Sequence, residues 1–161
     1  MEEDRNPMPK IDVSRLSAIV GSKYPKPFDE PCQSRERRRL GDAAGLTQFG
    51  VNMLRLAPGA WSSQRHWHSH EDEFVYVLAG EVWLVTDAGE EVLRTGDCAG
   101  FKAGVRDGHH LVNRSSSDAL LLEVGTRDER DFGEYSDIDM VFKPNRYSGG
   151  GGFARKDGTP Y

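Results

Sequence analysis

Short apolar segments separated by glycine-containing turns fill the middle of this chain, and they constrain its fold more than any other feature. The segments are rich in β-branched and aromatic residues, and none shows the spacing of an amphipathic helix. A turn at Asp87-Ala88-Gly89-Glu90 predicts a hairpin. The pattern predicts strands at residues 47–56, 63–68, 74–78, 81–86, 91–94, 98–101 and 119–124, with another beginning near residue 109. This density of strands indicates an all-β fold, an antiparallel sandwich or barrel over residues 46–126.

The first 45 residues differ in character from this central region. A short helix is predicted from Ser14 to Val20, ended by Gly21. A proline-containing segment of this kind runs extended and is excluded from central strands. Its prolines are Pro7, Pro9, Pro25, Pro27 and Pro31. We expect residues 1–45 to form an extended arm that lies over the main body or over a second subunit.

Residues 127–161 are predicted to form a C-terminal extension. The stretch from Tyr135 to Phe142 is expected to be an edge strand or an arm. The stretch from Ser148 to Gly152 is glycine-rich and is expected to be flexible. Phe153 to Tyr161 then forms a short tail.

Two apolar runs predict that one sheet face is covered. Residues 82–85, Val-Trp-Leu-Val, and residues 120–122, Leu-Leu-Leu, are apolar at every position, whereas a strand with one face in water alternates. We therefore expect the arm or a partner subunit to cover this face, and we predict a homodimer. Trp83 is interpreted as a core or interface aromatic residue.

Length and charge exclude several classes of protein. The 161 residues suffice for one domain with a substantial core. A formal net charge of −5, spread along the chain, argues against a nucleic-acid partner. The basic run from Arg35 to Arg39 is interrupted by Glu36 and is interpreted as a solvated or intersubunit surface. We also expect no contact with a membrane, because no apolar stretch has membrane-spanning length.

The N-terminus and the cysteines indicate a cytoplasmic protein. Residues 1–5 are mostly acidic and lack the apolar core of a signal peptide. Cys32 and Cys98 match neither a disulfide framework nor a zinc-site spacing, so reduced thiols are expected. Cys98 is interpreted as a small buried hydrophobic residue rather than a catalytic thiol.

All five histidines fall in two short clusters. The first reads His-Trp-His-Ser-His-Glu-Asp-Glu over residues 66–73, and the second is His109-His110. Alternate side chains of a strand share a face, so His66 and His68 converge and Glu73 can meet them across a tight turn. Solvated histidines are the alternative interpretation. Two clusters that each open a strand favour a shared divalent transition metal, with Fe, Mn, Ni, Co, Zn and Cu all suited to these donors.

The clusters and the glycines around them resemble the motifs of the cupin superfamily. The first motif matches Gly59, His66-Trp67-His68, Glu73 and Gly80, with one residue more than usual between Gly59 and His66. The second motif matches Gly96, residues 102–104, His109 and Asn113. Lys102 stands where proline is usual, and the loop before His109 is two residues longer than usual. The resemblance covers about half of the chain.

The resemblance implies a double-stranded β-helix, which is a jelly-roll barrel of two packed antiparallel sheets. It also implies four metal ligands, namely His66, His68, Glu73 and His109. His68 and His70 form a rival His-x-His pair, but this pair leaves too little chain before Glu73 for the usual turn.

Two further residues of the second motif are expected near the ligands. If His109 points into the site, His110 points out of it and lies behind the ligands or at the rim. Asn113 keeps the face of His109 and is expected to hydrogen-bond near the pocket floor.

Three imidazoles and one carboxylate leave two positions open on a six-coordinate metal, which is typical of a working rather than a structural site. A small-molecule substrate with adjacent oxygens fits such a site, with the metal as a Lewis acid. Stand-alone cupins often resemble sugar-phosphate isomerases, so a metal-dependent isomerase is the first hypothesis. An Fe(II)-dependent oxygenase and a non-catalytic binding or sensor module are the alternatives.

A phosphorylated substrate requires cations at the rim of the pocket. The candidates are Arg65, Lys102, Arg106 and Arg114, each of which is equally well explained as a solvated surface charge. Proton transfer also requires a free base. The sequence identifies no residue for that role.

Overall fold

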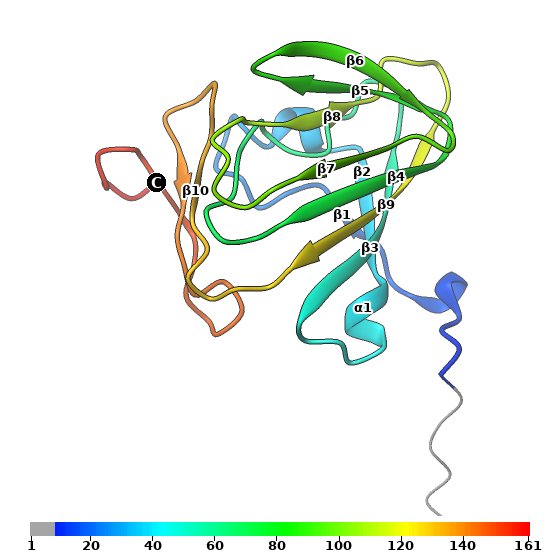
Figure 1. Ribbon diagram of the computed structural model, residues 1–161, viewed down its shortest axis with the longest axis horizontal. Helices are drawn as coiled ribbons and strands as arrows, with labels where there is room; N and C mark the ends of the chain where they lie inside the picture. Colours follow the sequence, from blue (N-terminus) through cyan, green and yellow to red (C-terminus); the bar gives the residue numbers. More distant parts are fainter. Residues whose placement is uncertain (1–8) are drawn as a thin grey trace, which may run out of the picture.

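The computed structural model describes residues 9–161, and two antiparallel sheets face each other in it (Figure 1). The larger sheet has the order β1-β2-β3-β9-β4-β7, and the smaller has the order β6-β5-β8. Their strands are β1 (Ile19–Val20), β2 (Arg35–Arg39), β3 (Phe49–Leu56), β4 (Glu73–Ala79), β5 (Glu81–Thr86), β6 (Gly89–Arg94), β7 (Cys98–Phe101), β8 (His110–Val112) and β9 (Ala119–Thr126). The all-β jelly-roll prediction is confirmed. The expectations for residues 1–5 and for Pro7 lie outside the described residues.

The hydrophobic core lies between these two sheets. Leu54 on β3 and Leu121 on β9 pair directly across the larger sheet and are fully buried. Val82 on β5 is fully buried from the opposite side. On β4 the buried residues Val75 and Val77 alternate with exposed ones, as expected for a strand with one face in the core.

The segment from residue 63 to residue 68, predicted to be a strand, is irregular, and that prediction was wrong. Only isolated bridges join it to its neighbours, from His66 to His109 and from His66 to Tyr135. Its backbone is divided between two partners, because the His66 amide donates to the His109 carbonyl oxygen at 3.3 Å and the Trp67 amide donates to the Glu134 carbonyl oxygen at 3.3 Å. A segment shared in this way keeps no continuous ladder.

The N-terminal region joins the larger sheet. The helix predicted from Ser14 to Val20 is wrong, because only the 3-10 turn η1 (Val13–Arg15) forms before the chain enters β1. Two further short helices are η2 (Glu30–Cys32) and α1 (Leu40–Ala43). The basic run, which was expected as a solvated or intersubunit surface, forms β2 and pairs with both β1 and β3.

Two arginines of β2, Arg35 and Arg37, have partners within the protein, whereas Arg39 is exposed. Arg35 is buried, and its Nε donates to the Gly21 carbonyl oxygen at 2.9 Å. Arg37 forms an ion pair with Glu123 on β9 at 2.9 Å.

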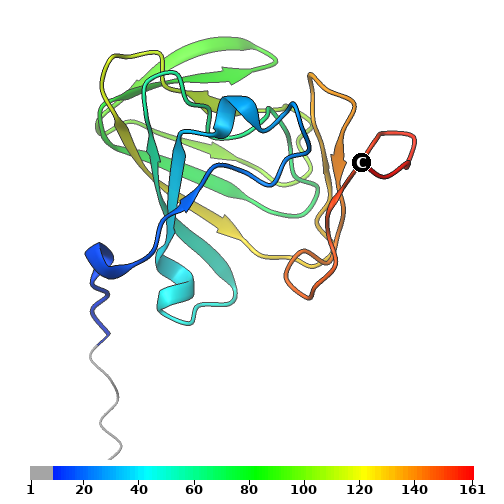
Figure 2. The ribbon, with the colours of Figure 1, turned by 180° about the vertical axis from the view of Figure 1, so that it is seen from behind.

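The C-terminal segment, residues 127–161, packs against one end of the barrel (Figure 1). It contains β10 (Gly133–Glu134), β11 (Val141–Phe142) and β12 (Phe153–Ala154), which form a third small sheet. Within the range from Tyr135 to Phe142, where a single strand or an arm was expected, only Val141–Phe142 forms a strand, and a loop connects it to β10. Seen from behind, the N-terminal chain before η2 reaches this segment (Figure 2), where the Tyr24 and Tyr135 rings lie 5.5 Å apart.

Gly133 shows how closely the C-terminal segment approaches the barrel. A Cβ atom at this position would lie 2.0 Å from the Trp67 carbonyl oxygen and 2.4 Å from Cε1 of Phe142. Only glycine fits there without a shift of the backbone.

Cys98 is exposed, which contradicts the prediction of a buried residue. It is the first residue of β7, which lies at the edge of the larger sheet and therefore leaves one side uncovered. Cys32 is buried, and both thiols are free. Across residues 9–161, none of the helices has the length and apolar character needed to cross a membrane.

Candidate metal centre

The structure brings the four side chains His66, His68, Glu73 and His109 together at one end of the barrel. Nε2 of His66 lies 3.1 Å from Nε2 of His68, which lies 3.3 Å from Oε1 of Glu73. Nε2 of His109 lies 2.6 Å from the other oxygen of Glu73, Oε2. Glu73 opens β4 and His109 directly precedes β8, so the two sheets deliver their parts of the cluster from opposite sides.

Each imidazole in the cluster is held in place by a neighbour, His66 and His68 through their other nitrogen and His109 through its ring face. The acceptor for Nδ1 of His66 is the Gln64 carbonyl oxygen at 2.8 Å, and for His68 it is Oδ2 of Asp131 at 2.7 Å. The His109 ring stacks in parallel on Phe101, with 3.6 Å between centroids. Because Nδ1 of His66 and of His68 is the donor, Nε2 is left to face the centre of the cluster.

Burial and mutual charge shift the pKa values within the cluster. Burial, together with the nearby His68, lowers the pKa of His66 to about 3. Burial also disfavours charge on His68, but Glu73 and Asp131 outweigh it and raise its pKa to about 9. Burial opposes ionisation of Glu73 as well, yet the facing imidazoles hold its pKa well below the usual range. Glu73 is therefore kept as an anionic donor.

The donor set fits a divalent transition metal. The ligating atoms of His66, His68 and Glu73 lie within 4.8 Å of one another, and His109 touches Glu73. Imidazole nitrogens with one carboxylate suit Fe, Mn, Co, Ni, Zn and Cu, and they do not select among them. The cluster is thus compatible with a metal ion whose identity the residues leave open.

A cavity of about 240 Å³ opens onto the cluster. His68, Glu73 and His109 form its inner wall. The rest of the wall consists of Glu71, Gly100, Phe101, Lys102, Val105 and Asp107. A space of this size, with apolar, acidic and basic wall residues, accommodates a small polar molecule.

The remaining histidines and Asn113 lie away from this cavity. His70 is exposed, and its Nδ1 lies 2.8 Å from the Ser69 hydroxyl, so the rival pair with His68 does not converge. His110 packs against Trp61 with 4.7 Å between ring centroids, and not at the rim.

Asn113 was expected near the pocket floor, and that expectation was wrong. Its Nδ2 donates to the carbonyl oxygens of Leu56 at 2.8 Å and Ser117 at 2.7 Å, which closes the turn before β9. Its fully buried side chain stabilises the barrel end rather than the cavity.

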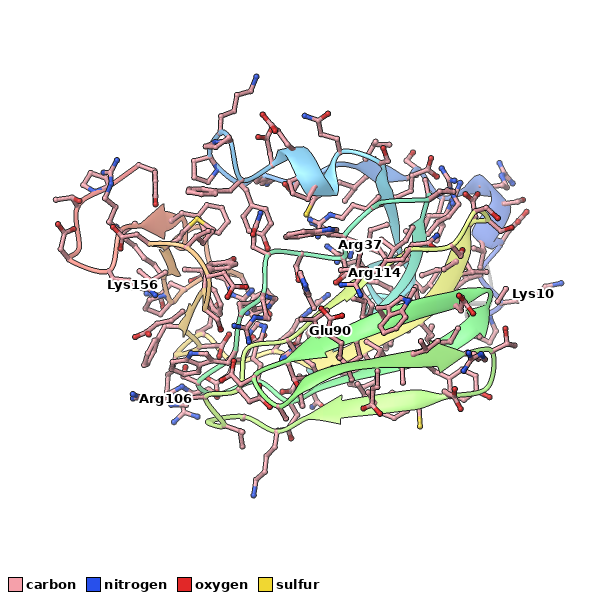
Figure 3. All side chains as sticks on the ribbon, turned by 90° about the horizontal axis from the view of Figure 1, so that it is seen from above. Lys10, Arg37, Glu90, Arg106, Arg114 and Lys156 are labelled. Carbon is pink, nitrogen blue, oxygen red and sulfur yellow. The ribbon has the colours of Figure 1, made fainter. Side chains whose placement is uncertain are left out.

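Of the four cationic candidates, only Lys102 lines the cavity. Arg65 is held by Asp87 and Asp137, and Arg114 by Glu90 at 2.6 Å. Figure 3 shows Arg114 and Glu90 side by side, with Arg106 at a distant corner of the molecule. The guanidinium of Arg106 lies over the Trp67 ring at 5.2 Å. Within residues 9–161, Lys102 makes no ion pair.

Sequence reasoning missed a charged network next to His68, whose two carboxylates are buried. Its acidic members are Glu71 and Asp131, and Arg146 reaches both of them at 2.6 and 2.8 Å. The hydroxyl of Tyr147 donates to Glu71 at 2.6 Å. Glu71 could have been suspected because it falls inside the first histidine cluster. No local pattern marks Asp131, Arg146 or Tyr147.

The fold and the site define the class of protein. Two packed antiparallel sheets enclose one core, and an imidazole and carboxylate cluster compatible with a metal ion lies at the barrel mouth. Residues 52–125 match the model of the cupin domain. The chain belongs to the cupin superfamily, and the predicted resemblance is confirmed.

Solved structures support this membership. A cupin-superfamily protein from Silicibacter pomeroyi, named as a sugar phosphate isomerase, is 47% identical with a TM-score of 0.90, over 95% of this chain and 96% of its own. A protein from Acidithiobacillus ferrooxidans, for which sugar phosphate isomerase activity has been proposed, is 27% identical with a TM-score of 0.71, over 79% and 80%. The polyketide cyclase RemF from Streptomyces resistomycificus is 20% identical with a TM-score of 0.62, over 75% and 80%, and shares the fold. A search of curated proteins found no significant match.

Proposed function

We propose that the chain is a metal-dependent isomerase that acts on a small sugar phosphate or a similar oxygen-rich metabolite. The observation that carries the proposal is the cavity, whose wall includes His68, Glu73 and His109 of the cluster and also Lys102. The likeness to the Silicibacter pomeroyi protein, which extends over almost the whole of both chains, supports the same class of substrate.

Different residues of the chain would hold the metal, bind the phosphate and exclude water. His66, His68, Glu73 and His109 would hold the metal, which when bound supplies Lewis-acid polarisation of a substrate oxygen. Lys102 would bind the phosphate at the mouth as a cationic hydrogen-bond donor. Phe101 stacks on His109 and keeps one side of the cavity apolar, which excludes water from the reacting atoms.

Proton transfer between adjacent carbons requires a base, and two acidic wall residues lie outside the histidine cluster. Glu71 is already occupied, because Arg146 and Tyr147 bind its carboxylate. Asp107 has one oxygen bonded to the Asp87 amide at 2.8 Å and meets no arginine in the described part of the chain. We therefore assign the role of proton acceptor to Asp107.

The reaction class is tested with purified protein reconstituted with Mn²⁺, Co²⁺, Zn²⁺ or Fe²⁺. A panel of aldose and ketose phosphates is followed by NMR, and oxygen consumption is recorded in parallel. Interconversion of aldose and ketose without oxygen uptake is the expected result. Oxygen uptake that depends on iron would replace the proposal with an Fe(II)-dependent oxygenase, and binding without turnover would replace it with a sensor or binding module.

We also propose that the protein is a homodimer in the cytoplasm, with its two free thiols reduced. Phe74, Tyr76 and Leu78 place three large apolar side chains on the outer face of β4, with 42%, 38% and 41% of each exposed. Such a row on one strand is typical of an interface. The expected mass in solution is twice the 18.0 kDa of one chain. Light scattering should show that Leu78→Asp is monomeric and that Val105→Asp, exposed elsewhere, is still dimeric; a monomeric wild type would refute the dimer.

A further inference from the structure

A buried carboxylate from the C-terminal segment holds one of the cluster histidines. Asp131 is completely buried and lies 63 residues from His68 in the chain. We propose that Asp131 is a positioning residue that orients His68 toward the metal, with Arg146 fixing Asp131 in turn. This inference rests on the proposed metal site and adds the C-terminal segment to it.

Both oxygens of Asp131 are engaged, so its carboxylate has one orientation. Oδ2 accepts from Nδ1 of His68 at 2.7 Å and from Nη2 of Arg146 at 2.8 Å. Oδ1 accepts from the His70 amide at 2.9 Å. These bonds attach the carboxylate to the backbone next to His68 as well as to its ring, and the imidazole cannot rotate without breaking them.

Arg146 balances the charge of this network. Its Nη2 also donates to Oε2 of Glu71 at 2.6 Å, and its guanidinium carbon lies 4.6 Å from the centre of the Phe142 ring. His68, Glu71 and Asp131 alone have the geometry of a second cation site. Because the guanidinium already bridges the two carboxylates, we interpret the three residues as a support for His68.

The consequence for the metal follows from the tautomer of His68. Asp131 keeps the proton of Nδ1 in its own hydrogen bond, so Nε2, which faces Glu73 and His66, is the nitrogen left for a metal. A carboxylate behind a ligating imidazole also raises the basicity of the ligand nitrogen, and removal of such a partner typically weakens metal binding about 10- to 100-fold.

The proposal is tested by Zn²⁺ affinity, measured by competition with a chromophoric chelator. We expect Asp131→Ala to bind Zn²⁺ about 10- to 100-fold more weakly than the wild type. Asp131→Asn, which keeps an acceptor of nearly the same shape, should lose less and covers the case in which the alanine variant fails to fold. The matched control is Asp128→Asn in the same segment, whose carboxylate binds exposed Arg130 and should leave the affinity unchanged. Wild-type affinity in folded Asp131→Ala and Asp131→Asn would overturn the positioning role.

A second readout separates positioning from general loosening of the fold. In ¹H–¹⁵N spectra of the Zn²⁺-loaded protein, the Nδ1 proton of His68 should be protected in the wild type and exchange rapidly in Asp131→Ala. The Nδ1 proton of His66, which is held by the Gln64 carbonyl, should be unchanged. Loss of both signals would indicate a structural effect and contradict the proposal. If His68→Ala binds Zn²⁺ with wild-type affinity, the proposed metal site itself is refuted. If His68→Ala loses affinity and the Asp131 variants do not, only the role of Asp131 is refuted.

Discussion

His66 and His68 are two residues apart, yet they differ in the hydrogen-bond partner of Nδ1 and in the direction of the pKa shift. The partner of His66 is a backbone carbonyl within the same irregular segment, at Gln64. The partner of His68 is the carboxylate of Asp131, which belongs to a segment outside the barrel. The pKa of His66 falls to about 3, mainly because it is buried. The pKa of His68 rises to about 9, since Glu73 and Asp131 outweigh its burial.

The difference shows that the candidate metal centre depends on two parts of the chain. We call them the barrel side, with His66, and the C-terminal side, with Asp131 and Arg146. On the barrel side, His66 is oriented by a neutral backbone acceptor only two residues away in the chain. The C-terminal side is specified by long-range contacts between charged groups, which are costly to bury unless all of them are paired. Substitutions on the two sides should therefore differ in their effects on metal affinity and on stability.

The largest effect is expected for His68→Ala, the residue at which the two sides meet. The substitution removes one donor and leaves Asp131 with Arg146, so the chain should stay folded and lose most of its bound metal. The loss of affinity should exceed the roughly 100-fold upper range for residues behind a ligand. Elemental analysis of the purified variant measures it, and circular dichroism checks the fold.

The control for this experiment is His70→Ala, because His70 is exposed and only two residues away. It should retain wild-type metal content. Full retention in His68→Ala would refute the site.

Gly133→Ala tests the C-terminal side through packing alone. The added methyl group would meet the Trp67 carbonyl oxygen at 2.0 Å, so the segment must shift. Overpacking of this kind costs about 1–3 kcal/mol in free energy of unfolding. Denaturant unfolding measures the loss, and Zn²⁺ affinity should fall with it because Asp131 lies two residues away.

Gly50→Ala provides the matched comparison on the barrel side. A Cβ at Gly50 meets its nearest neighbour, the Arg127 side chain, at an ordinary 3.5 Å. Equal stability of the two variants would show that the C-terminal segment is not held tightly against Trp67.

The same division explains which features could be predicted from the sequence. The strands of the barrel follow from alternation and glycine turns, and the hairpin of β5 and β6 forms where its turn signal stands. His66, His68, Glu73 and His109 could be selected together because each precedes or opens a strand. These patterns involve residues that are close together in the chain, so a single sequence is enough to recognise them.

The remaining features depend on partners far away in the chain. The irregular path through His66 is set by bonds to both His109 and the C-terminal segment, which no pattern within residues 63–68 records. Asp131 and Arg146 are unremarkable in sequence and acquire a role only when the segment packs against the barrel. Asn113 was misplaced for the same reason, since its turn partners decide its orientation.

The smallest effect is expected for Lys102→Ala at the open side of the cavity, where neither the metal cluster nor the charged network is disturbed. Lys102 is exposed and lines the cavity, so the variant should fold and bind metal as the wild type does. Because Lys102 is exposed, its interaction with a phosphate is worth up to about 1 kcal/mol, which corresponds to a KM up to roughly fivefold higher for a phosphorylated substrate. Steady-state kinetics measures this change.

Lys10→Ala controls for the loss of a surface charge, because Lys10 is exposed and does not line the cavity. In Figure 3 it lies across the molecule from Arg106, which is next in sequence to the wall residue Asp107. Its KM should equal that of the wild type. A phosphorylated and an unphosphorylated substrate should differ in their response to Lys102→Ala, since only the former presents the anion. An equal change in KM for both substrates would show that Lys102 does not contact the phosphate. The cavity would then be assigned to an uncharged metabolite.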